Sequence, residues 1–215
     1  MDGLRLHLGC GSTVVEGWVN IDRSPNVWLT RVPTLRPALR RARILTEDQA
    51  SAVFPPGIVR ADVRRGLRYP DKSVSYIYSS HLIEHLSRWE GLELLRECRR
   101  VLATGGLVRL ATPDLAELVG EYVRGETRLG PTAADSFMEQ LLTFREVPGS
   151  VVQRVARRLV TAPHQWLYDA ESLRRLLDEA GFADAERRSF HDSSLPDIDL
   201  LEDRPESLFM ETRAS

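Results

Sequence analysis

The stretch that decides the fold is Leu4-Arg-Leu-His-Leu-Gly9-Cys10-Gly11-Ser12, followed shortly afterwards by Val19-Asn20-Ile21-Asp22. In both segments apolar residues alternate with polar ones, which is the pattern of a β-strand. The first segment ends in a Gly-X-Gly turn, where the missing side chains let a ligand approach the backbone. The second ends in a carboxylate, which can accept hydrogen bonds from two ribose hydroxyls. Together the two segments predict a site for the ribose end of a nucleoside cofactor.

The length and composition of the chain narrow the class of protein. Its 215 residues are enough for one α/β domain with an insertion. The net charge of −2 gives no positive field for nucleic acid. No apolar run approaches the ~20 residues that cross a bilayer, and the first strand begins too early to follow a signal peptide. Cys10 and Cys98 form no disulfide or zinc pattern. We therefore expect a cytoplasmic enzyme or binding domain with no nucleic-acid or membrane partner.

Short apolar runs alternate with helical patterns along most of the chain, as in sheets built from βαβ units. The clearest helix is predicted from about Trp89 to Leu102, where apolar residues recur at the spacing of a core-facing stripe. Asp169 is expected to cap a later helix that runs to Ala180 and stops at Gly181. The predicted strands span Leu4–Leu8, Trp18–Asp22, Ile58–Asp62, Val74–Ser79, Gly106–Ala111, Ala183–Phe190 and Ser207–Thr212.

Two segments interrupt this alternation. Residues 24–57 separate the second and third strands, and their arginines form either a solvated helix face or a site for an acceptor's phosphate or carboxylate. Residues 114–164 separate the fifth strand from the last helix and are predicted to form three short helices. An insertion after the carboxyl end of a strand lies over the ligand crevice of an open α/β sheet, so 114–164 is the predicted acceptor lid. The arginines of the first segment are Arg31, Arg36, Arg40, Arg41 and Arg43.

Three cofactors use such a glycine turn. A dinucleotide fingerprint needs a third glycine where this chain has Val14. The nine residues between Leu8 and Trp18 are also too few for a full crossover helix, whose N-terminus would bind pyrophosphate. A phosphate-binding P-loop needs a Gly-Lys-Ser/Thr that is absent. S-adenosylmethionine has no phosphate and needs only close backbone approach with ribose and adenine contacts, so it fits best.

These residues resemble the class I S-adenosylmethionine-dependent methyltransferases, in particular the methyltransferase type 11 group, over most of the chain. The most specific match is Leu67-Arg-Tyr-Pro-Asp71 with Val74-Ser-Tyr-Ile-Tyr-Ser-Ser-His-Leu-Ile-Glu-His-Leu86, which is similar to the fourth-strand signature of the family. Leu6-His-Leu-Gly-Cys-Gly11 looks like the first motif of the family. Two departures stand out, because Thr13 takes the place of a third glycine and the first helix is truncated.

The resemblance implies a Rossmann-like, doubly wound α/β fold over residues 1–215, with a mostly parallel seven-stranded sheet, an antiparallel last strand and a helical lid insertion. It also implies methyl transfer from S-adenosylmethionine to an oxygen or nitrogen of a small-molecule or glycan acceptor. In that reading Asp22 binds the ribose and Asp62 contacts the adenine amino group. The cofactor-binding residues that we expect are Gly9, Cys10, Gly11, Asp22, Asp62, Val63 and Ser79.

Methyl transfer needs little covalent chemistry, because the sulfonium is already a good leaving group and the protein mainly aligns the acceptor. A base is useful where the acceptor is a hydroxyl. His81 and His164 are the candidates, because histidine titrates near neutral pH, although His164 also fits a structural role.

The segment His81-Leu-Ile-Glu84-His85 has the spacing of an inverted zinc-protease motif. It follows a predicted strand inside the methyltransferase signature, so a protease is disfavoured. Some members of the family that this chain resembles bind a divalent metal here, but they usually carry Glu where this chain has His81. We therefore expect no metal.

A second hypothesis is a catalytically reduced S-adenosylmethionine-binding partner or regulatory subunit. The eroded glycine motif and the lack of an unambiguous base motivate it. Activity of the purified protein distinguishes the two.

Overall fold

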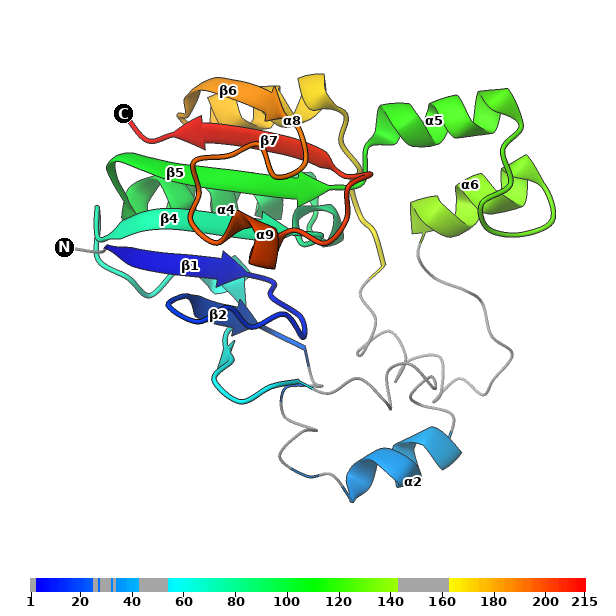
Figure 1. Ribbon diagram of the computed structural model, residues 1–215, viewed down its shortest axis with the longest axis horizontal. Coiled ribbons are helices and arrows are strands. Elements are labelled where there is room, and N and C mark those ends of the chain that lie inside the picture. Colours follow the sequence, from blue (N-terminus) through cyan, green and yellow to red (C-terminus); the bar gives the residue numbers. More distant parts are fainter. Residues whose placement is uncertain (1–2, 25–26, 28–31, 33, 43–53, 143–162) are drawn as a thin grey trace.

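A computed structural model describes residues 3–24, 27, 32, 34–42, 54–142 and 163–215 of the chain. Its centre is a seven-stranded sheet with the order β3-β2-β1-β4-β5-β7-β6 (Figure 1). Neighbouring strands from β3 to β5 pair in parallel, and β7 lies antiparallel between β5 and β6. The predicted α/β fold with an antiparallel last strand is thus confirmed. The strands are β1 (Leu4–Leu8), β2 (Val19–Asp22), β3 (Val59–Arg60), β4 (Val74–Ser80), β5 (Leu102–Thr112), β6 (Ala183–Arg188) and β7 (Leu208–Arg213).

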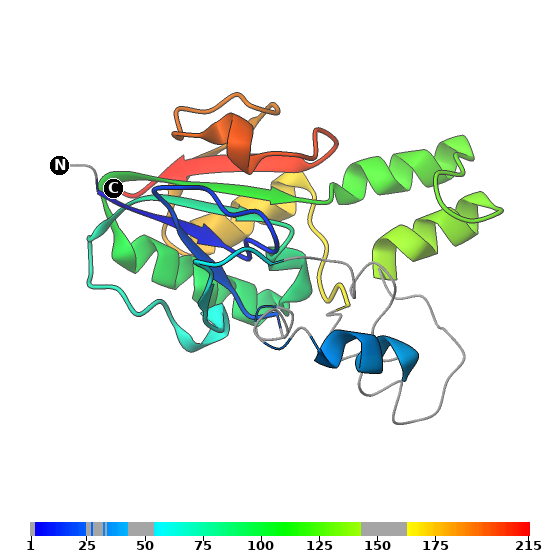
Figure 2. The same cartoon turned by 60° about the horizontal axis from the view of Figure 1, so that its bottom comes forward.

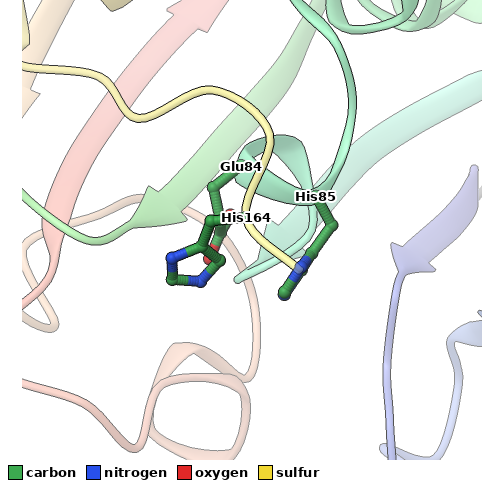
Figure 3. A group of neighbouring side chains, drawn as sticks. All are labelled: Glu84, His85 and His164. Atoms are coloured by element: carbon green, nitrogen blue, oxygen red, sulfur yellow. The ribbon is translucent and has the colours of Figure 1, made fainter. Parts of the chain in front are cut away.

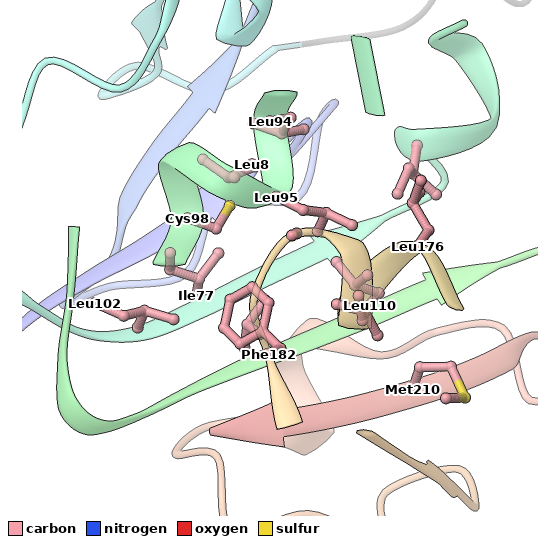
Figure 4. Packing of buried hydrophobic residues seen from close by; sticks show 14 of the residues in the cluster. Leu8, Ile77, Leu94, Leu95, Cys98, Leu102, Leu110, Leu176, Phe182 and Met210 are labelled. Atoms are coloured by element: carbon pink, nitrogen blue, oxygen red, sulfur yellow. The ribbon is translucent and has the colours of Figure 1, made fainter. Parts of the chain in front are cut away.

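One face of the sheet is covered by two helices, α4 (Arg88–Val101) and α8 (Ala170–Glu179). Both begin with reciprocal capping boxes, and Asp169 caps α8 as predicted. Their apolar stripes pack on the strands, where Leu8 and Ile77 meet Leu95 and Cys98 in a continuous buried cluster (Figure 4). This face therefore holds the main hydrophobic core.

The opposite face lacks a first crossover helix. Between β1 and β2 the described chain makes only turns, which confirms the predicted truncation. Val15 and Trp18 from this connection pack with Tyr78 and Leu107 of the sheet in a smaller cluster. The segment between β6 and β7, which includes the short helix α9 (Ile198–Leu201), supplies the rest of the cover (Figure 1).

A buried arginine ties this segment to the sheet. Arg109 of β5 is fully buried and donates through Nε to Glu202 Oε1 at 2.5 Å. Its terminal nitrogens donate to the carbonyl oxygens of Asp192 and Ser189 at 2.9 and 2.8 Å, and to Glu211 Oε2 at 3.3 Å. Each contact joins β5 to residues between β6 and β7 or to β7 itself. The ion-pair network therefore fixes the position of the segment that leads into β7.

The two insertions contain helices where the structure describes them. Helices α5 (Leu115–Arg124) and α6 (Ala133–Leu142) lie side by side beyond the carboxyl end of β5 (Figures 1 and 2). The third helix predicted within 114–164 falls outside the described residues. In the first insertion, helix α2 (Leu35–Arg41) exposes Arg40 and Arg41, while Arg31 and Arg43 lie outside the described residues. None of the described helices combines the length and apolarity that spanning a membrane requires.

The third and fifth strands differ most from their predicted bounds. The third strand is limited to Val59–Arg60, because Asp62 already caps the short 3-10 helix η1 (Val63–Arg65) through a hydrogen bond to Arg64 N. The fifth strand begins at Leu102, directly after α4, and runs to Thr112. Gly105 and Gly106, which follow the helix, thus belong to an extended strand.

We expect Arg109→Met to destabilise the protein by about 3–5 kcal/mol, because it leaves the Glu202 and Glu211 carboxylates buried without their cation. Urea unfolding followed by circular dichroism measures this change. The matched control is Arg96→Met, which removes an exposed arginine paired with Glu93 and should cost less than about 1 kcal/mol. Equal effects of the two substitutions would contradict the structural role of Arg109.

Candidate functional site

The glycine turn at the end of β1 has the backbone that its sequence predicts. Gly9 and Gly11 have φ values of 69° and 55°, a region that favours glycine. A Cβ on Gly9 would lie 3.0 Å from the Cβ of Leu82, whereas the space around Gly11 is open. Gly11 N donates to Asp22 Oδ2 at 2.9 Å, so the carboxylate that ends β2 is attached to the turn that ends β1.

A cavity of about 310 Å³ opens beside this turn, and we call it the turn cavity. Four of the predicted cofactor residues line it: Gly9, Cys10, Gly11 and Asp22. Burial raises the pKa of the Cys10 thiol to about 12, so this side chain presents a thiol rather than a reactive thiolate.

The other three predicted cofactor residues do not line the turn cavity. Hydrogen bonds from Arg64 hold the Asp62 carboxylate and keep its pKa below the ordinary range. Val63 packs in the main core. Ser79 is buried, and the adjacent Ser80 lines the cavity instead, because successive side chains of a strand point to opposite faces.

Sequence reasoning missed several residues of the turn cavity. His7 lies on β1, and Asp203 and Arg204 come from the segment before β7. Alternation along β1 places His7 on the face opposite Leu6 and Leu8, a signal that was available in the sequence. No local pattern connects the 203–204 region to the glycine turn.

A second cavity of about 650 Å³ lies between the strand ends and the α5–α6 pair, and we call it the lid cavity. Its walls include His85 and His164 together with Leu118 and Glu121 of α5. Both His81 and Arg204 line the turn cavity and the lid cavity. Of the two predicted catalytic histidines, only His81 therefore stands where the cavities meet.

The backbone and partners of His81 hold its ring in one place. The residue follows β4 directly and has a φ of 48°. Its Nδ1 lies 3.1 Å from Glu84 Oε1, outside the angles of a hydrogen bond but within ion-pair distance, and its Nε2 lies 3.0 Å from Ser207 Oγ. Glu84 is fully buried. Burial alone would raise the pKa of Glu84, but the His81 and His85 imidazoles outweigh it and hold this pKa below its ordinary value.

Glu84, His85 and His164 form a compact group whose ligand atoms lie within 4.8 Å of one another (Figure 3). Nδ1 of His85 faces the Pro163 carbonyl at 3.2 Å, and Nδ1 of His164 faces the Leu141 carbonyl at 3.1 Å. Carbonyl oxygens only accept, so each ring donates through Nδ1, and the neutral form of each ring has its lone pair on Nε2. Two imidazoles and a carboxylate suit a divalent transition metal. The expectation that no metal binds here stays a prediction.

The sheet order, the glycine turn and the carboxylate after β2 together define a class I S-adenosylmethionine-dependent methyltransferase fold. Residues 9–186 match the model of a family described as "Methyltransferase domain", and the chain belongs to this family. The resemblance found in the sequence is confirmed at the level of this class, and S-adenosylmethionine is its cofactor.

The chain is similar to two proteins of known structure and to a sequence relative. A "SAM dependent methyltransferase" from Archaeoglobus fulgidus has a TM-score of 0.51 at 16% identity, with 99% of this chain and 87% of that chain covered. A Mesorhizobium loti protein of the same description has a TM-score of 0.45 at 21% identity, with 99% and 91% covered. A Mycolicibacterium smegmatis protein named "Probable S-adenosylmethionine-dependent methyltransferase" is 39% identical over 59 residues, which are 26% of this chain and 22% of that relative.

The buried His7 predicts a pH dependence of folding stability. Burial lowers its pKa from 6.5 to about 4. Between these values the unfolded chain binds a proton at His7 that the folded chain does not, so the unfolding free energy falls as the pH falls through this window. His7→Phe should make that slope shallower by up to about 1.4 kcal/mol per pH unit.

Urea unfolding at several pH values between about 4 and 7 measures this slope. His191→Asn, at an exposed histidine whose positive φ asparagine tolerates, is the control and should keep the wild-type slope. Burial also lowers the pKa of His164, so the His7→Phe variant should retain part of the dependence. An unchanged slope in His7→Phe would rule out the proposed proton linkage.

Proposed function

We propose that this protein transfers the methyl group of S-adenosylmethionine to an oxygen or nitrogen of a small-molecule or glycan acceptor. The turn cavity would hold the cofactor and the lid cavity the acceptor. The observation that carries the proposal is the position of His81, which lines both cavities. A group at this junction can act on an acceptor atom that faces the methyl carbon.

The residues at the glycine turn fit the nucleoside part of the cofactor. Each Asp22 oxygen accepts one backbone hydrogen bond, from Gly11 N and from Ser24 N, and keeps lone pairs for the ribose hydroxyls. The open space around Gly11 lets a ligand approach the backbone there. When bound, the cofactor supplies a methyl group on a sulfonium that is ready for in-line displacement.

His81 is the base in this proposal. The Glu84 carboxylate lies 3.1 Å from Nδ1 and favours the tautomer with its proton on that nitrogen, which leaves the lone pair on Nε2. Nε2 is then the atom that accepts the proton of an acceptor hydroxyl, at the position where Ser207 Oγ now lies. His164 donates through Nδ1 to the Leu141 carbonyl oxygen and lines the lid cavity as a neutral side chain.

We expect Asp22→Ala to weaken the binding of S-adenosylhomocysteine by about 10-fold or more, because the ribose hydroxyls lose a charged acceptor. Isothermal titration calorimetry measures the dissociation constant. Asp71→Ala removes an exposed carboxylate paired with Arg100, away from both cavities, and should leave it unchanged. No heat from either S-adenosylmethionine or its product with the wild-type protein at millimolar concentration would overturn the proposed function.

We expect His81→Asn to lower methyl transfer to a hydroxyl acceptor by about 10²–10⁴-fold while the protein still binds S-adenosylhomocysteine. Asparagine tolerates the positive φ of this position, so the backbone is preserved. His191→Asn makes the same replacement at another histidine with positive φ, outside both cavities, and should keep full activity.

The assay follows labelled methyl from S-adenosylmethionine into a panel of hydroxyl- and amine-bearing small molecules and glycans. Equal activity of His81→Asn and wild type would remove His81 from the mechanism. Wild-type protein that binds the cofactor but methylates no member of the panel would favour a catalytically reduced S-adenosylmethionine-binding partner.

A further inference from the structure

A buried carboxylate without a matching cation lies next to the lid cavity. Glu84 is 0% exposed, and its Oε1 makes no hydrogen bond to any described residue. Among the described residues no arginine or lysine pairs with it, and its ion-pair partner is the His81 ring. Since its pKa is held below the ordinary value, Glu84 is ionised at neutral pH. A buried charge without a full partner costs stability, which indicates that a ligand supplies a positive charge here.

Two imidazole rings beside this carboxylate line the lid cavity. They belong to His85 and His164, and each donates through Nδ1 to a carbonyl oxygen, so the neutral rings have their lone pairs on Nε2. One ligand atom from each of Glu84, His85 and His164 lies within 4.8 Å of the other two (Figure 3). An ammonium nitrogen about 2.9 Å from its acceptors separates them by about 4.7 Å, because its N–H bonds are tetrahedral. The group thus fits a protonated primary amine.

The remaining wall of the lid cavity is also acidic. Five carboxylates line it against two guanidiniums. Together with Glu84 and with Arg124 and Arg187, which pair with this wall from outside the lining, the described residues supply six carboxylates to four guanidiniums. The cavity therefore attracts cations and repels anions. The lining carboxylates are Asp114, Glu117, Glu121, Glu139 and Glu206, and the guanidiniums are those of Arg128 and Arg204.

We propose that the methyl acceptor is an amino alcohol, such as an amino sugar, whose ammonium group binds at Glu84, His85 and His164 while its hydroxyl faces His81. The two imidazoles accept hydrogen bonds from the ammonium, and Glu84 supplies the compensating charge. The hydroxyl oxygen takes the methyl group and gives its proton to His81 Nε2, which leaves a methyl ether and S-adenosylhomocysteine. This inference rests on the proposed function, since it takes the lid cavity as the place of the acceptor.

The test compares four acceptors that differ only at carbon 6: glucose, 6-amino-6-deoxyglucose, and the N-acetyl and N,N,N-trimethyl derivatives of this amine. The primary amine is protonated at neutral pH. Its kcat/KM should exceed those of glucose and of the acetylated sugar by about 10-fold or more, because it adds charge-assisted hydrogen bonds. The trimethyl derivative keeps the charge but has no N–H donor, so it should lack this preference. Equal values for the amine and for glucose, or for the amine and the trimethyl derivative, would overturn the proposal.

A substitution at the buried carboxylate tests the assignment to this group. Glu84→Gln removes the charge and keeps the shape, and it should lower the ratio of kcat/KM for the amine to kcat/KM for glucose by about 10-fold. Any effect of Glu84 on His81 acts on both acceptors and cancels in this ratio. Glu93→Gln, at an exposed carboxylate that lines neither cavity, is the control and should keep the wild-type ratio. An unchanged ratio in Glu84→Gln would remove the group from acceptor binding.

Should Glu84→Gln fail to fold, His164→Phe tests the same group. It removes one acceptor nitrogen from a partly exposed ring and should also lower the ratio for the amine over glucose. A wild-type ratio in this variant would contradict the proposal. Loss of the amine preference of the wild-type protein on adding EDTA would assign the group to a metal ion and would also overturn it.

Calorimetry separates a failure of this inference from a failure of the proposed function. If the wild-type protein methylates none of the four sugars, their binding is measured with S-adenosylhomocysteine already bound. Tighter binding of the amine than of glucose and the trimethyl derivative would support the ammonium site without methyl transfer. Equal or undetectable binding of the four sugars would overturn the ammonium site alone. No binding of S-adenosylhomocysteine would overturn the proposed function and this inference with it.

Discussion

The short parallel connection between β1 and β2 is the constraint on which the rest of the structure depends. Leu6 of β1 pairs in parallel with Val19 of β2, so the chain must run from the end of β1 back to the start of β2 in a few residues. This connection has no room for a helix that would cover the sheet. One face of the sheet is then left without its first helix. The connection itself, through Val15 and Trp18, and the segment before β7 cover it instead. The same segment carries Arg204 to the end of the sheet beside the glycine turn.

The two faces of the sheet are stabilised by different interactions as a result. Under α4 and α8 the contacts are apolar and continuous, and the helices are defined by their own caps. On the opposite face, buried polar groups set the arrangement. Arg109 satisfies carboxylates and carbonyls of the covering segment, and Asn20 satisfies the backbone of the β1–β2 connection and the ring of His7. A buried polar group that loses its hydrogen-bond partner lowers the stability of the fold. Such networks therefore favour the one arrangement of segments in which every group is paired.

This arrangement determines the chemistry available at the strand ends. His81 leaves β4 with a positive φ, and its ring lies between Glu84 and Ser207. Ser207 belongs to the covering segment and Glu84 to the turn after β4, so the position of the ring depends on both. Neutral histidines with one ring nitrogen bound to the protein occur at both cavities, as His7 and His164 show. In each case the hydrogen bond at Nδ1 places the lone pair of the neutral ring on Nε2.

Local sequence signals determined the strands, the two capped helices and the link between the glycine turn and Asp22, because alternation, caps and turns depend on residues close in the chain. The resemblance to a known family implied the seven-stranded sheet with its antiparallel last strand and the class of cofactor. Which side chains of a strand point into a cavity depends on how that strand pairs and packs in the sheet. For this reason Ser80 rather than Ser79 lines the turn cavity. Likewise, only the tertiary structure placed Arg204 on the cavity that His7 also lines. Residues so far apart in the chain leave no local sequence pattern when they come together. Their positions are set by how the segments pack and not by the residues next to them in the sequence.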